Sequence, residues 1–245
     1  MTSEGLGRSQ IHLAAMFSGA PDEITSLGRT AERGRFDFVV LHQGGPDPLT
    51  TLAAVSGATE RIGLVAAVDI ESAEPFEVSR QLATLDHLSA GRAGWSVTGT
   101  ENATRAREFV ALVHEFWDSW ADDAVLADTD SGIYSDPGRI RSVDFAGDHF
   151  VARGLATLPT GPGGHPVLVS GSDFHDVSAF GGTPERVADE MISRVQSAAC
   201  AGFTVPADGL TEFVDSVVPV LVARGVFRTG YAGTTLREHL GLIGV

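Results

Sequence analysis

The sequence predicts an α/β protein built on parallel strands, of the barrel type in which strands and helices alternate. One observation is the stretch 60–96, which reads as strand, helix and strand at a spacing that makes the two strands parallel neighbours. Another is that short apolar runs and amphipathic helices alternate along the chain. The length of 245 residues also fits one (β/α)₈ barrel with little left over. Without an internal repeat or a linker, we expect a single domain over 1–245.

The stretch 60–96 supports each of its elements by local chemistry. Residues 62–68 form a β-branched and aliphatic run with no helical period, so we expect a strand. Glu74 precedes Pro75 and therefore avoids the α region, which favours a helix start just beyond it. The helix expected over 76–88 places its leucines and Val78 on one face. A turn at 90–92 then leads into a strand at 93–97.

The rest of the chain follows the same alternation. Six strands are expected in all, at 11–17, 36–41, 62–68, 93–97, 166–170 and 203–205. Further helices are expected at 22–33, 49–59, 104–120, 184–200 and 210–224, the last broken or bent at Pro219. The strand at 36–41 is apolar except for Asp37, so both of its faces should be buried. Residues 121–162 are acidic and glycine-containing, and we expect an irregular segment there.

Composition excludes several classes of function. The net charge of −15 makes a nucleic-acid backbone or an anionic membrane an unsuitable partner. All 17 basic residues are arginine, so Schiff-base and lysine-base chemistry are excluded. With Cys200 alone, no internal disulfide can form, which fits the cytoplasm. Neither an export signal nor an apolar run of about 20 residues is visible, so we expect a cytoplasmic protein without a membrane span.

Several blocks carry a family resemblance. ATERIGLVAAV, EPF and LDHLSAGRAGW resemble the third-to-fourth strand segment of the bacterial luciferase-like flavin monooxygenases. The similarity is greatest to the nitrilotriacetate and dibenzothiophene-sulfone monooxygenase-like branch. AERGRFDFVVL, HPVLVSGSD, GTPERVADEM and the C-terminal block ending TTLREHLGL match in the same order. The resemblance implies a luciferase-type TIM-barrel fold, reduced FMN supplied by a separate flavin reductase, and a small organic substrate.

The resemblance also implies that part of the barrel is missing. In the family, the sixth and seventh strands and their helices lie between the blocks that match HPVLVSGS and GTPE. Here only residues 173–182 join those blocks, too few for two β/α units. The sequence therefore predicts a truncated barrel that closes with fewer strands or stays open. Because an open parallel edge and its apolar surface need a cover, we expect a homodimer.

Candidate site residues follow from the rule that barrel enzymes place their sites at the carboxyl ends of strands. That rule selects His42, Asp69 and Glu71 as candidate catalytic groups for proton transfer. The residues expected to bind the cofactor are Gln43, Ala67, Ser96, Thr98, Gly171 and Ser172. The histidines lack metal-ligand spacing, so no metal site is expected.

The same residues leave alternatives open. His42 is equally well read as a hydrogen-bonded histidine at the rim, and Asp69 with Glu71 as a solvated acidic loop. Asp69, Glu71 and Asp173 would place negative charge near an anionic reduced flavin and its phosphate. Three functions therefore remain. The chain is an FMN-dependent monooxygenase, a flavin-free biosynthetic enzyme that uses the acid and base groups, or a non-catalytic relative that binds flavin or a partner.

Overall fold

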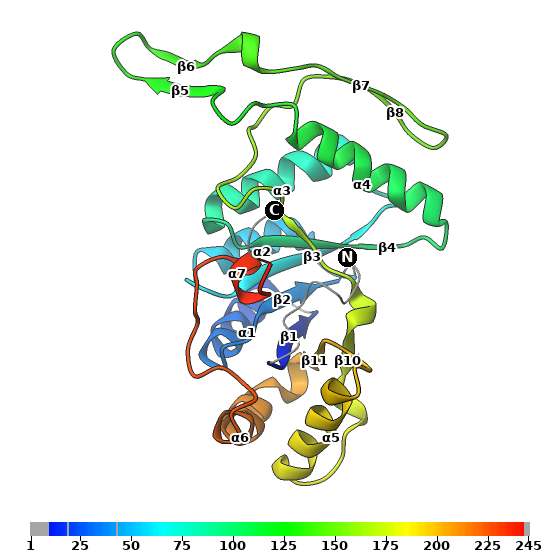
Figure 1. Ribbon diagram of the computed structural model, residues 1–245, viewed down its shortest axis with the longest axis vertical. Coiled ribbons are helices and arrows are strands. Elements are labelled where there is room, and N and C mark those ends of the chain that lie inside the picture. The colour runs from blue at the N-terminus through cyan, green and yellow to red at the C-terminus, as the bar shows by residue number, and fades with distance from the viewer. Residues whose placement is uncertain (1–9, 19, 43, 243–245) are drawn as a thin grey trace.

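The computed structural model describes residues 10–18, 20–42 and 44–242, and its main feature is one curled sheet of seven parallel strands. The order across the sheet is β10, β11, β1, β2, β3, β4, β9, which leaves β9 and β10 at the two edges (Figure 1). The strands are β1 His12–Phe17, β2 Phe38–Leu41, β3 Gly63–Asp69, β4 Ala93–Thr98, β9 Val167–Leu168, β10 Phe174–Asp176 and β11 Gly202–Pro206. The sheet is an open half-barrel, which confirms the predicted truncated α/β barrel.

Six helices form a layer on one side of this sheet, and neighbours in the layer touch in the order α5, α6, α1, α2, α3, α4. Their bounds are α1 Pro21–Arg33, α2 Pro48–Ser56, α3 Pro75–Ser89, α4 Ala103–Trp117, α5 Pro184–Gln196 and α6 Leu210–Ala223. Pro219 lies inside α6 without ending it, so the helix continues through the position where a break or bend was expected.

Both faces of the strands are buried, as the apolar strand at 36–41 predicted. Leu13, Val39 and Leu64 face the helix layer. Their neighbours in sequence, such as Ala14, Phe38 and Val65, face the inside of the half-barrel. This alternation with a period of two follows from strand geometry.

The inside of the half-barrel is closed at one end by the short helix α7, which spans Leu236–His239. The C-terminal tail that contains it was expected to be extended or loosely helical. A capping box between Thr235 and Glu238 starts this helix. A Cβ at Gly63 or Gly94 would lie 2.5 or 2.6 Å from a methyl group of Leu236. Glycine at these two positions is therefore what lets α7 pack against β3 and β4.

Arg92, in the block LDHLSAGRAGW, has a structural role. Its guanidinium is buried and donates hydrogen bonds to the carbonyl oxygens of Ser56, Thr59 and Ile62 at 2.9–3.1 Å. These bonds fix the start of β4 to the segment that joins α2 to β3.

The deleted region differs from the expectation in detail. We expected six strands, and the main sheet has seven, because residues 173–182 contain the short strand β10. Val169 to Asp173 joins β9 directly to β10 without a helix of the outer layer. The two edge strands have only two and three residues, and such short edges resist pairing with another chain. The truncation itself therefore gives little reason to dimerise.

The segment 121–162, expected to be irregular, instead forms two antiparallel hairpins. They are β5 Val125–Asp128 with β6 Ile133–Ser135, and β7 Val143–Ala146 with β8 Val151–Gly154. The β7–β8 hairpin packs on α4, where the rings of Phe150 and Phe109 lie 5.6 Å apart. The β5–β6 hairpin extends away from the body of the molecule (Figure 1). The prediction failed because both hairpins are short and lack long apolar runs.

Candidate active site

A cavity of about 290 Å³ lies inside the half-barrel, and each of the strands β1, β2, β3, β4, β10 and β11 contributes to its walls or rim. The β9–β10 connection provides the remaining wall. The lining residues are Met16, Phe38, Val40, His42, Val65, Ser96, Val169, Gly171, Phe174, Asp176 and Thr204. A cavity inside a parallel barrel, at the carboxyl ends of its strands, is where such folds place their sites.

The cavity has apolar walls and a few polar groups. Ser96 is buried near the end of β4, whereas His42 is exposed just beyond β2. Asp176 and Thr204 add a carboxylate and a hydroxyl from neighbouring strands. Ligand pockets usually measure about 300–1,000 Å³, so this cavity is at the small end. It has room for a ring system, and a larger ligand would extend beyond it.

The structure brings some of the predicted site residues together in this cavity. His42, Ser96 and Gly171 line it. Ala67 is buried on the same face of the sheet without lining it. Two others do not line it: Thr98 is opposite Asp69 in the sheet, and Ser172 has its Oγ 2.8 Å from that of Ser170. The predicted residue Gln43 is outside the described residues.

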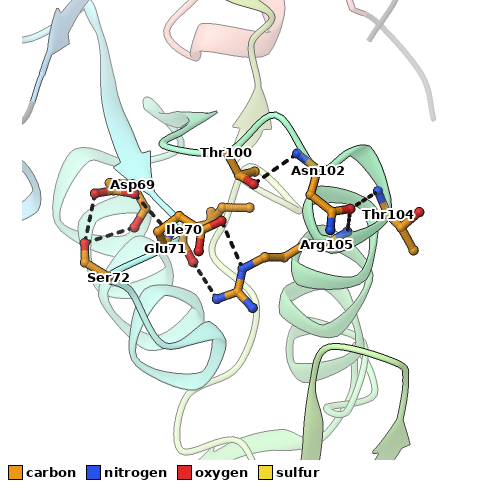
Figure 2. Close-up of polar contacts among 8 residues, drawn as sticks. All are labelled: Asp69, Ile70, Glu71, Ser72, Thr100, Asn102, Thr104 and Arg105. Atoms are coloured by element: carbon orange, nitrogen blue, oxygen red, sulfur yellow. Dashed lines mark hydrogen bonds and ion pairs between the residues drawn. The ribbon is translucent and has the colours of Figure 1, made fainter.

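Asp69 and Glu71 do not line the cavity, and Figure 2 shows them at the end of β3 and in the turn that follows it. Asp69 accepts hydrogen bonds from the backbone N–H of Glu71 at 3.0 Å and from the hydroxyl of Ser72 at 3.1 Å. Glu71 forms an ion pair with Arg105, whose Nε lies 3.4 Å from Oε1. The two carboxylates therefore stabilise the turn after β3, and their catalytic role stays a prediction.

Arg105 joins this turn to α4. It donates a hydrogen bond to the carbonyl oxygen of Ile70 at 3.2 Å, and its guanidinium lies 4.6 Å from the ring centre of Phe150. Asn102 caps α4 by accepting from the N–H groups of Thr104 and Arg105 (Figure 2). The conformation of this side of the sheet is thus held by the helix cap and by the β7–β8 hairpin.

Replacement of Asp69 by asparagine separates a turn role from a proton-transfer role. An asparagine oxygen still accepts the hydrogen bonds of the turn, but the side chain cannot act as a base at neutral pH. We expect Asp69→Asn to keep turnover within about threefold, while His42→Ala lowers it at least tenfold, since a positioned acid or base contributes about 10²–10⁴-fold. Steady-state kinetics of both variants decide this. A tenfold loss in Asp69→Asn would instead support the predicted catalytic role of Asp69.

Sequence reasoning missed most of the apolar lining. Met16, Phe38, Val40 and Val65 look like ordinary core residues, although strand alternation places Phe38, Val40 and His42 on one side of β2. Extending that alternation inward from His42 would have found them. Phe174 and Asp176 could not be found in this way because β10 itself was not recognised.

Neither Cys200 nor a cluster of metal-binding side chains gives a second candidate site among the described residues. Burial raises the pKa of Cys200, so its thiol stays protonated at neutral pH. Among the described residues, no cluster of three or more histidine, cysteine or acidic side chains is arranged to hold a metal ion. None of the helices in the described part of the chain is long and apolar enough to cross a membrane.

Comparison with known proteins defines the family. The family model for luciferase-like monooxygenases matches residues 5–179, more than half of the chain. The chain therefore belongs to the luciferase-like monooxygenase family, which confirms the resemblance seen in the sequence.

Individual relatives differ in how much of their length the chain matches. It is 33% identical over 244 residues to one of the subunits of pristinamycin IIA synthase of Streptomyces pristinaespiralis, covering 89% of this chain and 88% of the relative. It is 26% identical to N-acetyl-S-(2-succino)cysteine monooxygenase of Bacillus subtilis, covering 90% of each chain. That second alignment runs over 395 residues against 245 here, so at least 150 of its positions have no residue in this chain.

Solved structures agree on the fold. The long-chain alkane monooxygenase LadA superposes with a TM-score of 0.83 at 19% identity, covering 96% of each chain. EDTA monooxygenase from Chelativorans sp. BNC1 gives 0.78 at 22% identity, covering 95% of this chain and 98% of the other. At these identities the likeness shows the shared architecture.

Proposed function

We propose that this chain is the short subunit of a two-subunit, flavin-dependent monooxygenase that oxidises a small organic substrate. The observation that carries the proposal is the match, along nearly its whole length, to a relative of similar length that is named as a subunit of pristinamycin IIA synthase. The chain is also 34% identical over 177 residues to the other named subunit of that synthase, of which it covers only 37%. Two named subunits of that synthase, one short and one longer, are therefore both similar to this chain.

The size of the cavity supports this assignment. At about 290 Å³, the cavity inside the half-barrel is at the small end for a ligand pocket, and FMN together with a substrate would extend beyond it. A second luciferase-like subunit would supply the wall that the missing β/α units leave open, or the rest of the site. This reading modifies the expected homodimer, because the second subunit is then a different chain.

The residues of the cavity fit the ring system of a reduced flavin but do not fit its phosphate. The apolar walls and the hydroxyls of Ser96 and Thr204 suit a flat ring with a polar edge. Asp176 in the lining and Asp173 in the preceding turn put negative charge where a phosphate would need donors. A bound reduced flavin would supply the electrons for oxygen activation. In this chain, the walls would exclude water from the ring, and His42 at the rim would take or give a proton.

The flavin-free alternative loses its main support in this geometry. It required a carboxylate pair in the cavity, and Asp69 and Glu71 instead hold the β3 turn. His42 and Asp176 remain as polar groups near the cavity. A non-catalytic, flavin-binding subunit shares the cavity with the proposed function and differs only in turnover.

Titration with FMN tests the proposal. We expect oxidised and anaerobically reduced FMN to bind the assembled enzyme, with quenching of flavin fluorescence for the oxidised form. Binding that is absent up to about 1 mM, where it would be worth about 4 kcal/mol, would contradict flavin dependence. Product formation that needs this chain, its long partner chain and a flavin reductase together would support the complete assignment.

A further inference from the structure

Large apolar side chains are exposed mainly in the segment 121–162, which contains the two hairpins. Among the described residues, these are Leu126, Ile133, Tyr134, Val151 and Leu155, with Leu88 at the end of α3. Tyr134 and Leu126 have 61% and 52% of their surface exposed. Apolar side chains that gather in one region of a surface usually mark a contact with another molecule.

The hairpin β5–β6 and its flanks form the arm 122–136, in which Ala124 at the base is the one described residue that is fully buried. The β7–β8 hairpin is held to α4 by Glu108, which accepts hydrogen bonds from the N–H groups of Asp148 and His149. The arm has only two strands, and none of its described residues joins a hydrophobic core cluster. An isolated two-stranded hairpin is at best marginally stable in water.

The arm is nevertheless ordered at both ends. At its base, Arg139 pairs with Asp123 at 2.5 Å, and Trp120 donates its indole N–H to the carbonyl oxygen of Ala156 at 3.1 Å. At its tip, Asp128 accepts from the N–H of Asp130 and from the hydroxyl of Ser131. A segment fixed in this way loses little conformational entropy when it binds. These local bonds indicate a preformed binding element.

Charge decides what the arm can bind. The arm carries five aspartates, at 122, 123, 128, 130 and 136, and no basic residue, and the chain has a net charge of −15. At least nine of the 17 arginines already pair with carboxylates of the same chain. A second copy would therefore bring another acidic surface to the arm. A partner with an apolar strip flanked by basic side chains is complementary.

We propose that the arm 122–136 docks on the longer luciferase-like subunit of the two-subunit enzyme, with Leu126 and Tyr134 in an apolar strip that basic side chains flank. The inference rests on the proposed function for the identity of the partner. The apolar side chains would supply the contact area, and the aspartates would select a basic partner over a second copy of this chain.

The test compares an arm variant with a matched control. The arm variant carries Leu126→Ser and Tyr134→Ser, and the control carries Val151→Ser, which removes a still more exposed apolar side chain from the other hairpin. The probes are the luciferase-like chains of about 400 residues encoded in the same genome, purified one by one and titrated calorimetrically. We expect one of them to bind the wild-type chain, the arm variant to bind it at least tenfold more weakly, and the control to bind within twofold.

The other outcomes separate the two proposals. If a long chain binds and the arm variant binds equally well, the arm is not the interface, while the two-subunit assignment stands. If no long chain binds, the two-subunit proposal is wrong, and the proposed partner of the arm is then wrong as well. A wild-type homodimer that the arm variant dissociates, or a flavin reductase whose binding the variant abolishes, overturns the proposed occupant. Thermal unfolding should be nearly unchanged in both variants, since each of these side chains is more than half exposed.

Discussion

Replacement of Gly171 by phenylalanine is expected to lower the affinity of the assembled enzyme for FMN at least tenfold. Gly171 lines the cavity inside the half-barrel, and a Cβ built there meets no atom within 4 Å. A side chain can therefore be added at this position without displacing the backbone, and a benzyl group that points into the cavity would occupy space that a ligand needs. A tenfold loss corresponds to about 1.4 kcal/mol, well below the full burial of an aromatic ring.

Gly181→Phe is the matched control for this variant. Gly181 is also exposed, a Cβ added to it would also meet no atom within 4 Å, and it does not line the cavity. Fluorescence titration should show near wild-type FMN affinity for the control, and the two variants should unfold at similar temperatures. Equal affinities in Gly171→Phe and wild type would mean that FMN does not use this cavity.

Strand and helix positions could be predicted because the signals that set them are local. The expected strand 62–68 and helix 76–88 correspond to β3 and α3 within two residues at each end. The helix expected to start at residue 184 is α5, which begins at Pro184. By contrast, β10 has three residues and its pairing with β11 depends on distant sequence. No local pattern in Phe174–Asp176 distinguishes it from a turn.

The candidate site was predicted in part for a similar reason. The carboxyl-end rule selected His42, Ser96 and Gly171, which line the cavity, and their catalytic or binding roles stay predictions. For Asp69 and Glu71 the rule gave the right end of β3 and could not give the direction of the side chains. Asp69 fills the space beside Gly99, whose φ of +86° lets the chain turn there. Hydrogen bonding within the turn, which strand alternation ignores, sets where these carboxylates point.

The largest expected effect on stability comes from Asp37, the single charge in an otherwise apolar strand segment. Its carboxylate is fully buried. It contacts His12 Nδ1 at 2.9 Å and the guanidinium of Arg228, and it accepts a hydrogen bond from the N–H of Leu13 at 2.7 Å. The group thus ties β1 and the region before β2 to the C-terminal segment. Its role could not be read from sequence, since Arg228 lies 191 residues away.

Asp37→Asn is expected to lower the free energy of unfolding at pH 7 by about 3–5 kcal/mol, because it leaves the buried guanidinium of Arg228 without its counter-charge. Asp215→Asn is the control, since Asp215 pairs with Arg33 where both side chains are more than half exposed, and such pairs contribute about 0–1 kcal/mol. Urea denaturation followed by circular dichroism measures both. A loss in Asp37→Asn no larger than in the control would show that the buried pair adds little.

The pH dependence of unfolding gives an independent check on the same group. Burial alone would raise the pKa of Asp37, but His12, Arg228 and the N–H of Leu13 outweigh it and hold the pKa below the ordinary value of 3.8. A lowered folded-state pKa means that the stabilisation is complete above the unfolded-state value of about 3.9 and is lost as pH falls toward the folded-state value. The wild type should therefore lose stability more steeply below about pH 4 than Asp37→Asn does. Parallel curves for the two proteins between about pH 5 and pH 3 would place the acid-sensitive group elsewhere.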